Sequence, residues 1–360
     1  MFSKIEDILY FYSLVSIALI FYNVKYILLK NKKNKRHDFL VKKYIDEYYE
    51  NIKLIKENKN IDNKYNKKLI KELSSVKNLE AFNEAIASLK YTEDLEKYNM
   101  YLYNIFLELY TIYNKKSDME KVLFVYVIGN INIYNKDNRN LNNRIINFLE
   151  NPSVFLVENI LKTFVKLGDK DNIIKTIDIL NSKKIYHNEK LISDGLLNYT
   201  GDKLELAKEL WRYRNKWMVC YVKAVIKFIR MKSYDFKEEF YYALTKEKLD
   251  REIRLELVRY FGKVNYHNAL DYLIDVNQSE KNIDSNFLIV SATALSNYPS
   301  KRTIEVLKKG ITNSNWYIRR NSCTSFLSLN PSKNDIDDIL NGNDIYAKDI
   351  LLYQLDKGDK

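Results

Sequence analysis

The sequence is poor in glycine, proline and cysteine. Among its 360 residues are 8 Gly, 3 Pro and 2 Cys, and neither Gly nor Pro occurs before Gly129. A β-rich fold would need turn-forming residues throughout, so this scarcity favours an all-α chain. Hydrophobic residues make up 46% of the sequence, enough to bury a large core.

The two cysteines, Cys220 and Cys323, are too few for a disulfide framework, and we expect buried, reduced thiols.

Charged residues are also missing from one long apolar run near the N-terminus. Between Ile8 and Leu29 the only charge is Lys25, which can reach the headgroups from a helix end. A helix of this length spans roughly 33 Å, close to the hydrocarbon core of about 30 Å. We therefore predict a single transmembrane helix. A cleaved signal peptide would begin with basic residues and end at a small-residue cleavage site, whereas Glu6 and Asp7 precede this run and no such site follows. A buried core helix is the other alternative.

A basic run follows the apolar one and completes the predicted anchor, residues 1–37. It contains Lys30, Lys32, Lys33, Lys35 and Arg36, which together with Lys25 carry half of the net charge of +12. Positive charge marks the cytoplasmic side, so we expect the N-terminus outside and all that follows in the cytoplasm. The run should also attract anionic lipid headgroups, at about 1 kcal/mol per basic residue. Nucleic-acid binding by this run is a weaker interpretation, because its place beside the apolar span already explains it.

The next segment, residues 38–116, has the pattern of charged amphipathic helices. Residues 39–55 place aromatic and aliphatic side chains on one broad face, and a polar, Asn-rich stretch at 57–68 interrupts the pattern. Residues 93–113 are apolar around most of the helix circumference and should pack on several sides. We expect a helical connector or N-terminal cap for residues 117–360.

A helical pattern then recurs along the chain. The first residues of its copies, roughly 29–35 residues apart, are Leu156, Glu189, Met218, Ile253, Phe287 and Ile318. Eight residues after each of them stands a large apolar side chain: Phe164, Leu197, Ile226, Phe261, Leu295 and Phe326. Residues that stand zero, four, eight and eleven positions after the start of a copy lie along one stripe of a helix. A second apolar helix follows each copy, so each unit is a helical hairpin that must stack on its neighbours to bury its stripe.

The pattern resembles HEAT repeats, best in the segments Asp250–Arg254 and Asn315–Arg319, over roughly residues 117–345. Asp250 and Asn315 would cap the second helix of a unit. The resemblance implies that Ile253 and Ile318 are core residues, and that the arginines after them bond to the turn of a neighbouring unit. It further implies a right-handed, armadillo-like α-solenoid of HEAT-like hairpins, closer to the compact bacterial form than to the longer eukaryotic units.

The sequence contains no motif that indicates catalysis. We find no metal signature, Gly-rich phosphate loop or nucleophile elbow. The three histidines, His37, His187 and His267, are isolated, and we expect them on the solvated surface. We therefore predict that the chain is no enzyme and holds no cofactor and no metal.

One polar cluster is a candidate binding surface. It comprises Arg251, Arg254, Arg259, Arg319, Arg320 and Trp316. Arg254 and Arg319 are better explained as structural ties between units. Arg259, Arg320, Trp316 and Arg251 remain candidates for binding a partner on the inner face of the solenoid.

These observations favour a membrane-anchored cytoplasmic scaffold that binds a protein partner, itself membrane-associated. Solenoids present long surfaces suited to protein recognition, and the resemblance suggests a membrane enzyme complex. A nucleic-acid-binding HEAT-like protein is the first alternative, given a pI of 9.2, but nucleic acid is the less expected partner once the basic run is set aside. A HEAT-like lyase acting on a bound chromophore is the second.

Overall fold

The computed structural model describes residues 2–133, 140–278 and 284–358, so the extreme ends of the predicted anchor and solenoid lie outside the described residues. Within these ranges the chain forms nineteen α-helices, one short 3-10 helix and no strand. The helices group into two compact units, residues 1–176 and 177–360. The all-α prediction is confirmed.

The first unit contains two rows of helices that follow the chain. Its elements are α1 (Phe2–Lys56), α2 (Asn63–Leu73), α3 (Val76–Ser88), α4 (Glu93–Tyr113), α5 (Asp118–Ile131), α6 (Asn140–Ile145), the 3-10 helix η1 (Ile146–Leu149), α7 (Val154–Lys166) and the first half of α8 (Lys170–Ser182). In one row α1 packs on α3, α3 on α5 and α5 on α7; in the other α2 packs on α4 and α4 on α6. The predicted connector therefore packs in the same sequential manner as α5 and α7.

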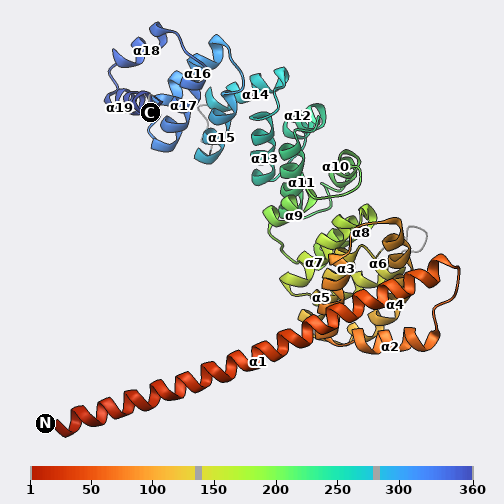
Figure 1. Cartoon of the computed structure of the whole chain (residues 1–360). Coiled ribbons are helices and arrows are strands. Elements are labelled where there is room, and N and C mark those ends of the chain that lie inside the picture. The colour runs from red at the N-terminus through yellow and green to blue at the C-terminus, as the bar shows by residue number, and fades with distance from the viewer. Residues whose placement is uncertain (1, 134–139, 279–283, 359–360) are drawn as a thin grey trace. The chain divides into compact units, whose positions relative to one another are not determined.

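Helix α1 has two parts with different environments (Figure 1). Its first part extends away from the other helices of its unit, and side chains such as Leu9 and Phe21 are more than half exposed. An 18-residue window of this helix has a mean hydropathy of 1.6 and is not buried at all. Its last part places Tyr44 and Tyr48 in the core. The chain thus has one long, unburied apolar helix near its N-terminus, consistent with a membrane anchor or a signal sequence. Because nothing in it is buried, the alternative of a core helix is wrong for this part.

The second unit repeats a helical hairpin. Its helices are α9 (Glu189–Leu196), α10 (Lys203–Arg212), α11 (Val219–Lys232), α12 (Lys237–Lys246), α13 (Arg251–Phe261), α14 (His267–Gln278), α15 (Ser285–Leu295), α16 (Lys301–Ile311), α17 (Trp316–Ser328), α18 (Lys333–Leu340) and α19 (Ile345–Gly358). From α10 onwards, each even-numbered helix packs on the odd-numbered helix that follows it, and the odd-numbered helices α9 to α19 pack on one another in order. The hairpins thus pack in sequence order, as the recurring helical pattern predicted.

The buried stripe and the helix caps follow the predicted spacing. The apolar residues at the eighth offset of the repeat, Phe164, Ile226, Phe261, Leu295 and Phe326, are all fully buried. The side chain of Asp250 accepts a hydrogen bond from the Glu252 amide at 2.8 Å, and that of Asn315 accepts one from the Tyr317 amide at 2.9 Å. These caps satisfy amides that have no partner inside the helix.

The copy at Glu189 departs from the pattern by one residue. Leu197 is only half-buried, whereas Ile192, Leu196 and Tyr199 form the buried stripe. Glu189 itself is not in the core, because it lies at the start of α9 and pairs with Lys227 on α11. The register of this unit therefore starts one residue earlier than the spacing indicated.

Buried tyrosines link successive hairpins. The Tyr260 hydroxyl donates to the Tyr234 carbonyl at 2.7 Å and accepts from the Phe236 amide at 2.9 Å. One unit further on, the Tyr298 hydroxyl donates to the Phe261 carbonyl at 3.1 Å. Each phenol thereby satisfies buried backbone groups of the preceding turn or helix end.

Candidate functional site

The predicted cluster of arginines and Trp316 comes from two helices, α13 and α17, which are separated by α15. Arg251, Arg254 and Arg259 stand on α13; Trp316, Arg319 and Arg320 stand on α17. Ile253 and Ile318, the repeat positions of these helices, are buried. Arg259 lines one cavity, and the three residues of α17 line another, so the cluster does not form one continuous site.

On α13, two of the arginines contact the next hairpin. Arg251 forms an ion pair with Asp284, the N-cap of α15, and a second one with Glu252 at 3.2 Å. Arg254 donates to the Tyr272 hydroxyl at 3.0 Å, and its guanidinium lies over the Phe287 ring, 5.1 Å from the centroid. Both side chains therefore contact the following unit.

The third arginine on α13 belongs to a buried charge cluster. The carboxylate of Glu256, almost fully buried, pairs with Arg259 at 2.6 Å and with Arg230 at 3.5 Å. Burial and the neighbouring Arg259 lower the pKa of Arg230, while Glu256 opposes that shift. Arg230 and Arg259 also line an open cavity of about 590 Å³ against α15. Arg259 and Arg230 thus share one buried carboxylate, so the three side chains keep a net positive charge.

On α17, Arg319 has a contact like that of Arg254. It donates to the Asn313 carbonyl at 3.0 Å, in the turn before its own helix. Its guanidinium lies over the ring of Tyr346 on α19, 5.1 Å from the centroid. Arg319 therefore links α17 both to the preceding turn and to the last helix.

The neighbouring Arg320 and Trp316 form the most exposed part of the predicted cluster. The guanidinium of Arg320 lies 5.3 Å from the centre of the Trp316 ring, and Trp316 is 47% exposed. Together with residues of α19 they line an open groove of about 460 Å³, whose lining includes Trp316, Arg319, Arg320, Tyr346, Asp349, Ile350 and Tyr353. Tyr346 and Tyr353 are more than half exposed. Aromatic rings, two cations and one carboxylate thus face solvent in one place, which we call the α17–α19 groove.

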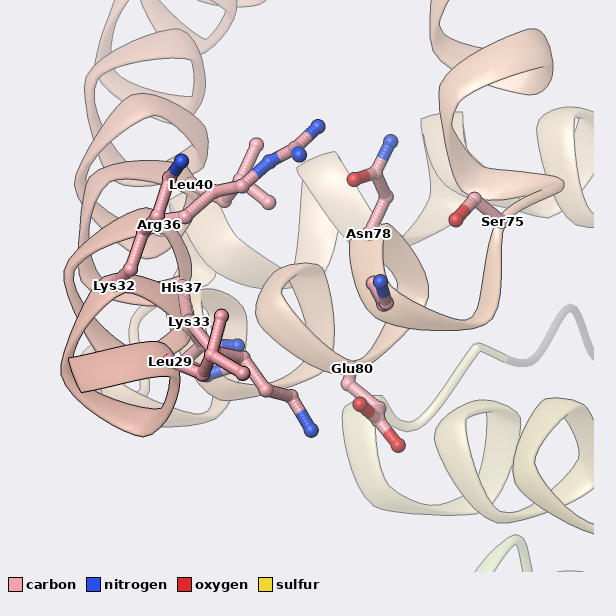
Figure 2. A pocket seen from close by; sticks show the side chains of 10 residues that line it. Leu29, Lys32, Lys33, Arg36, His37, Leu40, Ser75, Asn78 and Glu80 are labelled. Carbon is pink, nitrogen blue, oxygen red and sulfur yellow. The ribbon is translucent and has the colours of Figure 1, made fainter. Parts of the chain in front are cut away.

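The predicted membrane-surface residues lie on one continuous stretch of α1. Lys30 lies 6.0 Å from the Tyr26 ring centre. Lys32, Lys33 and Arg36 line a cavity of about 460 Å³ beside α3, and Lys35 does not line it. Figure 2 shows the cavity with α1 on one side and Ser75 and Asn78 on the other.

The histidines differ from the expectation at one position. His187, in the turn before α9, is buried rather than solvated, because this turn packs into the core of its unit. The Nε2 atom of His37 lies within hydrogen-bond distance, 2.8 Å, of a carboxylate oxygen of Glu84, and His267 is exposed.

The cysteines lie where the composition predicted. Cys220 and Cys323 are both free and buried. Burial raises the pKa of Cys323 to about 12 and also raises that of Cys220. A thiol held in its protonated form is a poor nucleophile.

In the part of the chain that the structure describes, no group of three or more His, Cys, Asp or Glu side chains is arranged to hold a metal ion.

Comparison with known proteins does not assign the chain to a family, since no protein-family model and no curated protein matches its sequence. The structure defines the class: an all-α protein of sequentially packed helices with one long, unburied apolar helix near the N-terminus.

Several site residues escaped the sequence reasoning. Tyr346 and Tyr353 lie past the recognised repeat span, although their spacing of two helical turns is visible in the sequence. Glu256 stands three residues before Arg259, a spacing that brings two side chains together on a helix. Lys77 completes the lining of the cavity beside α1, and no local signal relates it to a segment some forty residues earlier.

Proposed function

We propose that this protein is a membrane-anchored cytoplasmic scaffold that binds a protein partner in the α17–α19 groove. The apolar part of α1 would cross the membrane once, with the N-terminus outside. The hairpins would form a right-handed, HEAT-like α-solenoid that carries the groove. We expect no catalytic activity and no bound cofactor.

The anchoring part of the proposal rests on the exposure of α1. An apolar helix with no protein packed around it needs an apolar environment, and a hydrocarbon core provides one. The basic residues that follow it, Lys30 to Arg36, favour the cytoplasmic side for everything after them. A cleaved signal sequence is the competing explanation for the same helix.

The solenoid part of the proposal rests on repeated geometry. Odd-numbered helices pack in order, and an arginine one residue after each repeat isoleucine, Ile253 and Ile318, lies over an aromatic ring of a later helix. The positions of Arg254 and Arg319 match the arginine of HEAT repeats, which supports this resemblance without identifying a family.

The binding part of the proposal rests on one observation: exposed aromatic side chains and arginines gather on α17 and α19. Here Trp316, Tyr346 and Tyr353 stay exposed beside Arg320. Trp, Tyr and Arg are the residue types that dominate the binding energy of protein interfaces. A polypeptide that offers a carboxylate to Arg320 and aliphatic side chains to the rings would complement this groove.

Arg259 and Arg251 are secondary candidates. Both already form ion pairs, with Glu256 and Asp284, so we expect smaller effects from their removal than from removal of Arg320.

Tethering would raise the local concentration of any partner in the same membrane. The resemblance to anchored HEAT-like proteins suggests a subunit of a membrane enzyme complex.

The test is crosslinked affinity purification of the full chain from its native membranes. We would compare the unaltered protein with a Trp316→Ala/Arg320→Ala variant, a single Arg259→Ala variant and an Arg302→Ala control. Arg302 has an exposed side chain and pairs with Asp271 at 2.9 Å, away from the groove. A specific membrane protein lost only in the double variant supports the proposal. Recovery of nucleic acid, or the same proteins from all four chains, would contradict it.

A further inference from the structure

A cavity of about 460 Å³ lies between α1 and the first turn of α3 (Figure 2). Four basic side chains line it: Lys32, Lys33 and Arg36 from α1, and Lys77 from α3. Only one carboxylate, that of Glu80, is part of the lining. The cavity is therefore a site of concentrated positive charge built by two helices.

The four basic residues have no ion-pair partner in the described part of the chain. Other residues contact the nearby carboxylates: His37 lies 2.8 Å from Glu84, and Lys43 forms an ion pair with Glu72 at 2.6 Å. Like charges held close together repel one another unless an anion lies between them. An anionic ligand would relieve this repulsion.

The first turn of α3 borders the same cavity. Ser75, the N-cap of α3, lines it and makes no side-chain capping bond. The amides of the first turn of a helix point outward, and the helix dipole places partial positive charge there. In Figure 2 the Arg36 side chain extends from α1 toward Asn78 in that turn. The start of α3 therefore adds partial positive charge beside the basic side chains of the cavity.

The position of the cavity along α1 indicates which anion it meets. Leu29, the last residue of the apolar span, lines it as well. At 1.5 Å per residue, Lys32 and Lys33 lie about 5 Å beyond Leu29 along the axis, and Arg36 about 10 Å beyond it. The headgroup layer on one side of a bilayer is roughly 5–8 Å thick. If α1 is the anchor, Lys32 and Lys33 lie within the headgroup layer, and the backbone of Arg36 lies at its cytoplasmic edge.

We propose that this cavity binds the phosphate of an acidic phospholipid headgroup, gripped between Lys32 and Arg36 of α1 and Lys77 and the first turn of α3. The proposal rests on the membrane anchoring proposed above and goes further than a diffuse attraction of the basic run. It makes Lys77, which is outside that run, part of the site, and it leaves Lys35, which is inside the run, outside the site. A bound headgroup would hold α3 against the membrane surface.

The experiment is hydrogen exchange of the full chain in phosphatidylcholine nanodiscs, with and without phosphatidylglycerol. We expect exchange of the first turn of α3 to slow by about fivefold or more when the acidic lipid is present, the factor that corresponds to one basic contact at a membrane surface. Lys77→Gln and Arg36→Gln should remove most of this protection. Lys35→Gln changes the charge equally on the same helix and should keep it. Glu80→Gln, which removes the only carboxylate of the cavity, should reach the same protection with less acidic lipid.

Inorganic phosphate added to nanodiscs of phosphatidylcholine alone distinguishes a lipid headgroup from a free anion. Full protection by dissolved phosphate would contradict the proposal that the ligand is a lipid headgroup. Equal loss of protection in the Lys35→Gln and Lys77→Gln variants would contradict a specific site in the cavity. It would show instead that the basic residues attract acidic headgroups diffusely. No protection in a chain that stays in the nanodiscs would overturn the site and leave the anchoring intact. A chain that leaves phosphatidylcholine nanodiscs would instead contradict the anchoring itself.

Discussion

The guanidinium group of Arg254 lies over the aromatic ring of Phe287, with its central carbon 5.1 Å from the ring centroid. Phe287 is the first residue of the next copy of the repeat, so this contact joins two consecutive hairpins. Arg319 repeats the arrangement with Tyr346, also at 5.1 Å. The arginine after each repeat isoleucine thus fixes one hairpin relative to the next through a cation–π contact.

Replacing Arg254 by alanine should therefore loosen the α13–α15 interface. We expect a loss of about 1–2 kcal/mol of local stability, because the partly buried cation–π contact and the bond to Tyr272 both disappear. The measurement is hydrogen exchange of the full chain in detergent. Arg302→Ala removes an arginine whose ion pair is exposed, and should change exchange by less than about 0.5 kcal/mol. Equal effects of the two substitutions would show that Arg254 has no linking role.

A second prediction concerns the close approach of α16 and α17. A Cβ atom added at Gly310 would lie 2.9 Å from the Cβ of Ser322 and even closer to its hydroxyl oxygen. Gly310→Ala should cost about 1–3 kcal/mol through overpacking. Combined with Ser322→Gly, the loss should be smaller than the sum of the two single losses.

Gly195 provides the matched control for this prediction. It also lies within a helix, and no atom lies within 4 Å of a Cβ added there. Gly195→Ala should be neutral or stabilise the protein by up to about 1 kcal/mol. Urea unfolding followed by circular dichroism compares the four variants. Additive losses at Gly310 and Ser322 would contradict the predicted clash.

The hairpin array could be predicted because its signal is local and repeated. Phe261 and Phe326 occur at the same offset from Ile253 and Ile318, and helix geometry alone places all four on buried stripes. The cap residues Asp250 and Asn315 could be predicted for the same reason. The one-residue shift at Glu189 could not, because the ion pairs of this residue with Lys223 and Lys227 arise only when α9 packs on α11.

The sites were less accessible to sequence reasoning, since they depend on which helices become neighbours. The spacing identified Trp316 and Arg320 but not Tyr346, because α19 carries no recognisable copy of the repeat. Likewise, the basic run marked Lys32 and Arg36, but only the packing of α1 on α3 brings Lys77 to them. The separation of Arg259 from Arg320 also follows from packing, because α15 lies between their helices.

The ion pairs of Glu189 should make stability depend on pH. Burial opposes ionisation of this carboxyl, but hydrogen bonds from Lys227 and Lys223 outweigh it and hold its pKa below the ordinary 4.5. A lowered folded-state pKa means that the contribution is present above about pH 4.5 and disappears as the pH falls through the folded value. Glu189→Gln should thus be less stable than the unaltered chain near about pH 7, by at most about 1 kcal/mol.

Urea midpoints of both chains between about pH 7 and pH 3 check this prediction, and the gap should shrink toward the acidic end. Glu239→Gln, at an exposed position on α12, controls for the change in net charge. A gap that stays constant over this range would show that the ion pairs of Glu189 do not stabilise the fold.

The two parts of α1 predict opposite results for two truncations. Deletion of residues 1–37 removes only unburied or half-buried side chains among those described, and should release a soluble, folded helical protein. Deletion of residues 1–56 also removes Tyr44, Tyr48 and Ile52 from the core. The loss of three such side chains, at about 2–5 kcal/mol each, exceeds the stability of most domains. Fractionation and circular dichroism separate the outcomes, and a 1–37 deletion that stays in membranes would contradict the anchor.

The most direct test of the scaffold proposal is photocrosslinking from the α17–α19 groove in intact cells. A photoreactive amino acid would replace Tyr346 in the full chain, and a matched chain would carry it at Tyr242, a similarly exposed position on α12. We predict one discrete membrane-protein adduct from position 346, absent from position 242 and lost when Arg320→Ala is added. The same adducts from both positions, adducts with nucleic acid, or none from position 346 would contradict the proposal that this groove holds a protein partner at the membrane.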